Sequence, residues 1–200
     1  MLAFEIVNKY FAGDSRTNRE RMLAGDYYLA DDPLSADIAH RALQLCAVAY
    51  QAELHGDKAA YQAAMLELLG SFGAGAYIKP PLSVDYGENI YVGARTFINS
   101  NLTALDVGRI DIGEDCQIGP MVQLLTPIHP IEPEPRRNKL EAAKPIRLGD
   151  NVWLGGGVIV CPGVTIGANT VVGAGAVVVH DLPANVVAVG NPARISKQIP

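Results

Sequence analysis

The chain has 200 residues, enough for one substantial hydrophobic core and a smaller appendage, and its 49% hydrophobic and 18% charged residues are typical of a globular protein. A net charge of −5 without a long basic run argues against binding to nucleic acid or to a membrane surface. No segment has the apolar length of a membrane span, and residues 1–10 lack the pattern of a signal peptide. The three cysteines, Cys46, Cys116 and Cys161, lack metal or redox spacing, so free thiols in a reducing cytoplasm are expected.

Residues 1–75 are expected to form a small α-helical cap, because their apolar residues recur at helical spacing. One short helix is predicted at residues 17–23, and a long one from about residue 34 to residue 54. The long helix is expected to end at Gly56, and Asp57 is expected to cap the next helix. The predicted apolar face of the long helix consists of Leu34, Ile38, Leu45 and Val48. That of the next helix consists of Tyr61, Met65, Leu68 and Leu69.

From residue 76 onward the apolar residues follow a period of six. The clearest run at this spacing is Leu148, Leu154, Val160, Ile166, Val172 and Val178. An earlier run, in phase with the first, is Ile112, Ile118 and Leu124. The unbroken phase marks residues 125–144 as a loop that leaves the repeat and returns to it. A third pair, Val92 and Ile98, is offset by two residues, which implies a small insertion between Ile98 and Ile110.

A period of six is neither that of an α-helix nor the alternation of one long strand. It indicates a short strand followed by a corner, and three such units close one turn of about 18 residues in a parallel β-helix. Aliphatic side chains point inward, and Gly, Asn and Asp suit the corners. A β-sandwich with chance spacing is the alternative, but six consecutive matches argue against it. The protein is therefore expected to be mainly β, with residues 76–200 forming the β-helix, its loop and a C-terminal tail.

Several short segments resemble one family of enzymes over nearly the whole chain. They include Met22–Gly25, Asp85–Gly87, Asn89–Gly93, Asn99–Asn101, His129–Pro130, Gly149–Gly156, Pro162–Gly167 and Gly190–Ala193. These segments resemble the hexapeptide-repeat acyltransferases, and most closely the maltose, galactoside and nodulation O-acetyltransferases. The resemblance implies a left-handed β-helix, transfer of an acetyl group from acetyl-CoA to a hydroxyl, and a homotrimer with active sites between subunits. No metal is expected to be required.

His129 is the expected catalytic residue, because the resemblance places the family's catalytic histidine at this His-Pro pair. An alcohol is a poor nucleophile while it holds its proton, and a neutral imidazole near pH 7 is suited to accept that proton. From position alone, His129 would be interpreted as a histidine of a proline-rich surface loop. Direct transfer is expected, because Cys116 and Cys161 occupy repeat positions that favour small apolar residues over a nucleophile.

The resemblance implies that Asp85 and Asn99 bind the acceptor, a sugar of the maltose, glucose or galactoside kind. Asp106 lies in the predicted insertion and is expected to join them, and Glu141 is expected either to orient His129 or to contact the acceptor. Asn and Asp are also ordinary corner residues of such a coil, and Glu141 could be a solvated loop carboxylate. Phe97 stands where the galactoside enzymes carry tyrosine, which argues against a galactoside.

The binding site for CoA is expected to use small residues that let the pantetheine arm approach the coils and cations that neutralise the phosphates. The residues that the resemblance implies are Gly156, Ala174, Val179, His180, Arg194 and Lys197. His180 replaces the more usual lysine and Lys197 the more usual arginine. A solvated C-terminal tail is the alternative interpretation of the last two residues.

Three other functions remain open. The first is acetylation of an antibiotic or another xenobiotic by an enzyme of the same fold, although such enzymes usually lack the N-terminal cap that begins at Met22. The second is a non-catalytic trimeric scaffold. The third is a β-helical carbonic anhydrase with a three-histidine zinc site, which the sequence disfavours because His40 and His55, two of the four histidines, lie in the cap.

Overall fold

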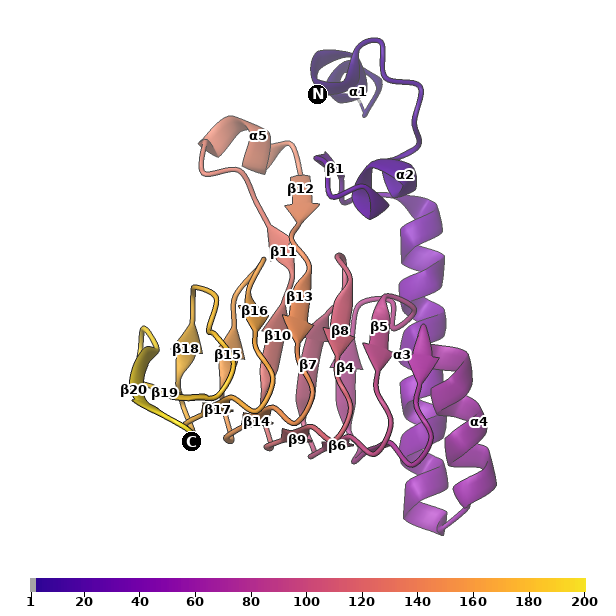
Figure 1. The fold of residues 1–200 in the computed structure, drawn as a ribbon. Coiled ribbons are helices and arrows are strands. Elements are labelled where there is room, and N and C mark those ends of the chain that lie inside the picture. The colour runs from indigo at the N-terminus through magenta and orange to yellow at the C-terminus, as the bar shows by residue number, and fades with distance from the viewer. Residues whose placement is uncertain (1–2) are drawn as a thin grey trace.

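The computed structural model describes residues 3–200, with side chains from Ile6 onward. A group of N-terminal helices adjoins a parallel β-helix, and one loop projects from the coil (Figure 1). The helices are α1 (Ala3–Phe11), α2 (Asn18–Leu23), α3 (Pro33–His55), α4 (Lys58–Leu68) and α5 (Pro133–Arg137). A small antiparallel sheet contains β1 (Tyr28–Leu29), β12 (Leu140–Ala143) and β11 (Pro127–Ile128). The mainly β architecture predicted from the six-residue period is confirmed.

The strands of the coil lie in three sheets. The first contains β2 (Ser71–Phe72), β5 (Ile90–Val92), β8 (Ile110–Ile112), β13 (Ile146–Leu148) and β16 (Thr165–Ile166). The second contains β3 (Tyr77–Ile78), β6 (Phe97–Ile98), β9 (Gln117–Ile118), β14 (Trp153–Leu154), β17 (Val171–Val172), β19 (Val186–Val189) and β20 (Arg194–Gln198). The third contains β4 (Leu82–Val84), β7 (Leu102–Leu105), β10 (Gln123–Leu125), β15 (Ile159–Val160) and β18 (Val177–Val178). All pairings in the coil are parallel except that of β20 with β19.

The interior of the coil is a stack of aliphatic side chains held in register by strand pairing. In the second sheet the stacked residues are Ile78, Ile98, Ile118, Leu154, Val172 and Ala188. All six are almost inaccessible to solvent, as is every residue of the run predicted from Leu148 to Val178. Burial of each valine, leucine or isoleucine contributes about 1.5–3 kcal/mol to the stability of the fold. Because each turn packs on its neighbours, the core extends along the coil instead of surrounding one centre.

The helices of the cap begin and end close to where the sequence predicts. Thr17 forms a capping box with Glu20 at the start of α2. Gly56 ends α3 in the left-handed conformation, and the Asp57 side chain accepts a hydrogen bond from the Ala60 N–H at the start of α4. In Figure 1, α3 and α4 stand beside the first turn of the coil. The coil begins with β2 at Ser71, slightly before the expected boundary at residue 76.

The buried face of α3 agrees with the prediction only in part. Ile38 and Leu45 are partly buried, and Leu45 packs against the core, but Leu34 and Val48 are 55% and 50% exposed. The fully buried positions of the helix include Ser35, Ala42 and Ala49. The helix packs along α4 and against β4, and close approach of two elements favours small side chains at the contact. The prediction weighted the larger apolar residues, whereas small residues occupy the most buried positions of this helix. The predicted face of α4 is confirmed, because all four of its residues are buried.

The insertions in the repeat lie at one edge of the coil, where the chain passes from the third sheet to the first. Two extra residues occur at residues 105–109, as the offset predicted, and two more at residues 85–89, which the sequence did not reveal. The loop of residues 125–145 leaves and re-enters the coil at the same edge. We call this corner the loop edge; its other turns are residues 161–164 and 179–181.

The corner between the second and third sheets has no such insertions. Its later turns lie at residues 99–101, 119–122, 155–158 and 173–176, and the last two of these are rich in glycine. We call it the glycine edge. A Cβ atom on Gly155 would lie 2.5 Å from the backbone nitrogen of Ala174, so adjacent turns approach closely there. Within residues 3–200, no helix combines the length and the apolar character that crossing a membrane requires.

Candidate active site

The projecting loop is held in place by the N-terminal cap. Strand β12 of the loop pairs on one side with β11 and on the other with β1 of the cap, so two strands of the loop and one strand of the cap form one sheet. At the tip of the loop, Lys9 of α1 forms an ion pair with Glu134, and Asn138 donates a hydrogen bond to the Tyr10 hydroxyl. The cap therefore fixes both the base and the tip of the loop, as the adjacent position of β1 and β12 in Figure 1 illustrates.

His129 follows β11 directly, and its side chain is 52% exposed. Its Nδ1 atom lies 3.3 Å from the carbonyl oxygen of Leu140. Because a carbonyl oxygen only accepts hydrogen bonds, this contact places the proton on Nδ1 and leaves a lone pair on Nε2. Nε2 lies 3.7 Å from Oε2 of Glu141. The ring is thus oriented by its Nδ1 contact, with its basic nitrogen beside a carboxylate.

Glu141 is held from the opposite side by the cap. Its side chain is only 12% exposed, and Oε1 accepts a 2.9 Å hydrogen bond from the hydroxyl of Tyr28. Tyr28 and Glu141 are directly paired across β1 and β12. Burial and the neighbouring carboxylate raise the pKa of Tyr28, so its hydroxyl remains a donor throughout the physiological range. Glu141 is therefore a largely buried, hydrogen-bonded side chain beside His129 and not a solvated loop carboxylate.

Asp106 and Asp85 lie in the two short insertions, and their surroundings differ. Asp106 is fully buried, and its carboxylate accepts hydrogen bonds from the backbone N–H groups of Asp85, Tyr86 and Asn89. It therefore shapes the first insertion. Asp85 is only partly buried. Burial, and then the nearby carboxylates of Asp106 and Glu141, raise the pKa of Asp85 to about 6. Asp85, Glu141 and His129 are thus gathered at the loop edge.

Asn99 is not brought to this group within one chain. It follows β6 at the glycine edge, where its Oδ1 accepts a hydrogen bond from the Ser100 N–H. Gly156 and Ala174 lie at the same edge, two turns and three turns further along the coil. The predicted acceptor residues are therefore divided between two edges of the chain, with Asn99 beside part of the predicted CoA site.

The remaining residues of the predicted CoA site lie toward the C-terminal end of the coil. Val179 and His180 follow β18 at the loop edge, and both are exposed. Arg194 and Lys197 belong to β20, the exposed antiparallel strand that ends the second sheet. The side chain of Arg194 donates a hydrogen bond to the carbonyl oxygen of Ala193, and it retains further N–H groups facing solvent.

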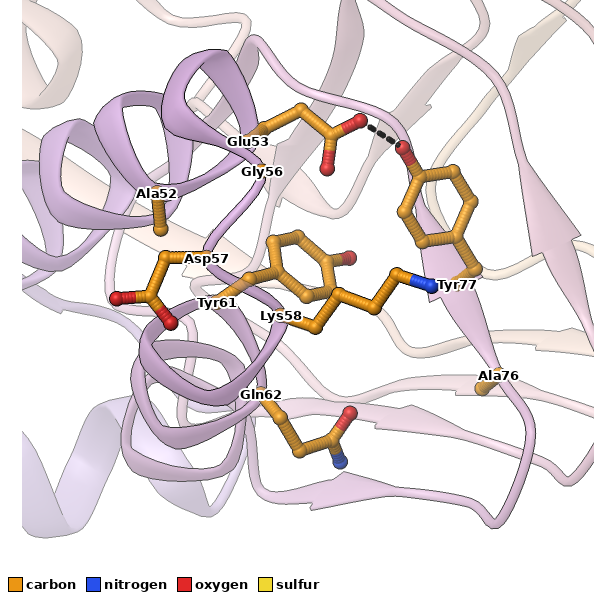
Figure 2. A pocket seen from close by; sticks show the side chains of 9 residues that line it. All are labelled: Ala52, Glu53, Gly56, Asp57, Lys58, Tyr61, Gln62, Ala76 and Tyr77. Carbon is orange, nitrogen blue, oxygen red and sulfur yellow. Dashed lines mark hydrogen bonds between the residues drawn. The ribbon is translucent and has the colours of Figure 1, made fainter.

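A pocket of about 410 Å³ lies elsewhere, at the turn between α3 and α4 (Figure 2). Its lining includes Lys58, Tyr61 and Tyr77, and Glu53 accepts a 2.7 Å hydrogen bond from the Tyr77 hydroxyl. None of the residues predicted to act in catalysis or binding lines it. The Tyr61 hydroxyl is engaged by the backbone of Ile78, so this pocket marks the joint between cap and coil.

Two residues beside or within the loop edge, Tyr28 of the cap and Thr126 of the loop, were not predicted from the sequence. Tyr28 stood beside Tyr27 in a short segment without periodicity, so nothing distinguished the two. Thr126 is buried, and its hydroxyl accepts from the Gly108 N–H and donates to the Leu105 carbonyl, which ties the second insertion to the base of the loop. In the sequence, Thr126 differs only in being a polar residue directly after two leucines, and that pattern by itself does not indicate a structural role.

Comparison with known proteins gives consistent matches. The bacterial transferase hexapeptide (six repeats) model matches residues 145–180, and the maltose acetyltransferase hexapeptide capping motif matches residues 21–73. Nodulation protein L of Rhizobium meliloti is 43% identical over 182 residues, which cover 90% of this chain and 98% of that protein. The crystal structure of a maltose O-acetyltransferase from Clostridium difficile 630 has a TM-score of 0.89 and 39% identity, covering 94% of this chain and 100% of that one. A galactoside acetyltransferase in complex with coenzyme A has a TM-score of 0.85 and 34% identity over 92% of each chain.

The hexapeptide repeats, the capping motif and these relatives together place the chain among the hexapeptide-repeat acyltransferases. Within that class, the chain belongs to the family of the maltose, galactoside and nodulation O-acetyltransferases. It is an acyltransferase, and the family membership expected from its sequence motifs is confirmed.

Proposed function

We propose that the protein transfers the acetyl group of acetyl-CoA to a hydroxyl of a sugar, with His129 as the general base. The observation that carries the proposal is the orientation of His129, whose Nδ1 faces the Leu140 carbonyl while Nε2 lies beside Glu141. The names of the relatives support a sugar hydroxyl as the acceptor, and the CoA complex of a galactoside acetyltransferase supports the donor.

The proposed reaction is a direct transfer. The acceptor hydroxyl gives its proton to Nε2 of His129 while its oxygen attacks the thioester carbonyl carbon, so a C–O bond forms and negative charge develops on the carbonyl oxygen. The intermediate then collapses with cleavage of the C–S bond, and the imidazolium of His129 returns the proton to the departing CoA sulfur. The Glu141 carboxylate stabilises the imidazolium between these two proton transfers, since opposite charges attract strongly in a partly buried site.

The acceptor is proposed to lie at the loop edge against Asp85. A carboxylate whose oxygens are partly exposed can accept hydrogen bonds from two neighbouring hydroxyls, which suits a sugar. Asp106 supports this contact indirectly by holding the backbone of Asp85, rather than by touching the acceptor. Asn99 provides a further donor and acceptor from the glycine edge.

We propose a homotrimer in which the glycine edge of one subunit faces the loop edge of its neighbour. This arrangement would unite Asn99, Gly156 and Ala174 with the His129 group, which a single chain keeps apart. Met121 at the glycine edge and Trp153 on the adjoining sheet are 57% and 55% exposed, and apolar surface of this kind suits a subunit contact. We also propose a cytoplasmic location, which the three free cysteines support.

Replacement of His129 tests the mechanism. CoA release would be measured with acetyl-CoA and a panel of maltose, glucose, a β-galactoside and an aminoglycoside antibiotic. The change His129→Ala is expected to lower kcat for the best acceptor by about a hundredfold or more. His40→Ala, on the exposed side of α3, is the matched control and should leave kcat unchanged. Undiminished activity of His129→Ala would refute the mechanism, and preference for the antibiotic would refute the sugar acceptor.

A further inference from the structure

Within residues 3–200, Tyr28 is the residue of the helical cap whose side chain forms a hydrogen bond to the proposed catalytic pair. The hydrogen bond from its hydroxyl occupies Oε1 of Glu141, and the other carboxylate oxygen is the one that lies 3.7 Å from Nε2 of His129. A carboxylate with one oxygen held in this way loses freedom of rotation about its last side-chain bond. Its second oxygen is therefore directed toward the imidazole.

The position of the Tyr28 ring is fixed by packing. The residue is 1% exposed, and its cluster of buried neighbours contains Met22 from α2, Val107 from the second insertion and Ala143 from β12. Tyr86 of the first insertion packs against the same cluster. The ring thus joins the cap to both insertions and to the loop, so the direction of its hydroxyl is set by four separate segments.

We infer that Tyr28 is a positioning residue that holds Glu141 in line with His129, and that the cap thereby takes part in catalysis. The inference rests on the proposed function, since it assigns a role relative to His129 as the base. It explains why the cap contributes a strand to the loop sheet, where Tyr28 and Glu141 are direct cross-strand partners. Without this contact, Glu141 would stabilise the imidazolium less well, and proton transfer from the acceptor would slow.

The change Tyr28→Phe removes the hydroxyl and keeps the ring in its packed position. With acetyl-CoA and the best sugar of the panel, we expect kcat to fall about tenfold with little change in the KM for acetyl-CoA, because one hydrogen bond to a charged group is lost. The acidic midpoint of the kcat–pH profile is expected to move to lower pH by about 0.5 unit, since the imidazolium is less stabilised. Tyr27→Phe is the matched control, because Tyr27 is the neighbouring residue and is 43% exposed.

A double-mutant comparison separates positioning from simple loss of stability. If Tyr28 acts through Glu141, Tyr28→Phe has no further effect on kcat in a Glu141→Ala background. An equal loss of kcat in both backgrounds, or an unshifted pH profile, would overturn the inference. So would wild-type kcat in Tyr28→Phe. If His129→Ala is inactive while Tyr28→Phe behaves as wild type, the inference alone fails; if His129→Ala is fully active, the proposed function fails as well.

Discussion

At the scale of single residues, Asp85 combines a proposed role in binding with a cost in stability. Its carboxyl group is partly buried beside two other carboxylates, which raise its pKa from the ordinary 3.8 to about 6. Ionisation is therefore harder in the folded than in the unfolded chain. As the pH rises from about 4 to about 6, the unfolded chain releases this proton first, and the folded state loses stability relative to it.

The change Asp85→Asn should remove this penalty. The variant is expected to be more stable than the wild type at pH 7 by about 1 kcal/mol, allowing for screening by solvent, and equally stable near pH 4. Urea unfolding at the two pH values measures the difference. Asp37→Asn on α3 serves as the control and should show no pH-dependent gain. A stability difference that is the same at both pH values would contradict the assignment of the shifted pKa to Asp85.

At the scale of elements, α3 shows how a helix with a weakly apolar buried face is positioned. The most buried positions of its inner face are small residues, which allow the helix axis to approach α4 and the first turn closely. Leu45 packs beside them, while Leu34 and Val48 face outward. The fit of such a face depends on volume more than on hydrophobicity. A larger side chain there must displace the helix or the first turn of the coil.

Substitution of two neighbouring alanines tests this packing. Ala49 is fully buried, whereas Ala47 lies on the exposed side of the same helix. Ala49→Leu is expected to lower the free energy of unfolding by about 1–3 kcal/mol through overpacking. Ala47→Leu should change it by less than about 0.5 kcal/mol. Equal effects in chemical denaturation would show that the alanine face is not a close contact.

At the scale of the whole molecule, the spacing between turns of the coil limits which residues can occupy the glycine edge. Gly155→Ala would place its Cβ atom 2.5 Å from the backbone nitrogen of Ala174, so the turns must separate and the thermal midpoint should drop by several degrees. The neighbouring Gly156→Ala meets nothing closer than 3.4 Å. It should leave the thermal midpoint nearly unchanged and raise the KM for acetyl-CoA. Equal thermal midpoints for the two variants would show that the close approach of adjacent turns at Gly155 does not affect stability.

The proposed trimer makes a second prediction at this scale. Asn99→Ala and His129→Ala should each be nearly inactive alone. If these two residues act from different subunits, unfolding and refolding an equal mixture restores roughly a quarter of wild-type activity, because some sites then combine two intact edges. Sedimentation would verify that mixed trimers form. No recovery in verified mixed trimers would mean that Asn99 and His129 act within one chain.

The sequence by itself determined the architecture. A strict period of six leaves few alternatives to a stack of short strands and corners, and it located the loop from Leu125 onward because the phase before and after the loop agrees. The motifs around His129 and the cap then indicated the family. Helix ends at Gly56 and Asp57 were equally predictable, since capping depends on residues close in sequence.

Only the tertiary structure decided how the site is assembled. The pairing of Tyr28 with Glu141 joins residues 113 positions apart, and no local pattern encodes such a contact. The structure also showed that the insertions share one edge of the coil, that Asp106 is a buried support, and that Asn99 lies at another edge. These features depend on how separate turns stack and on which face of a helix meets them, and apolar spacing does not specify either.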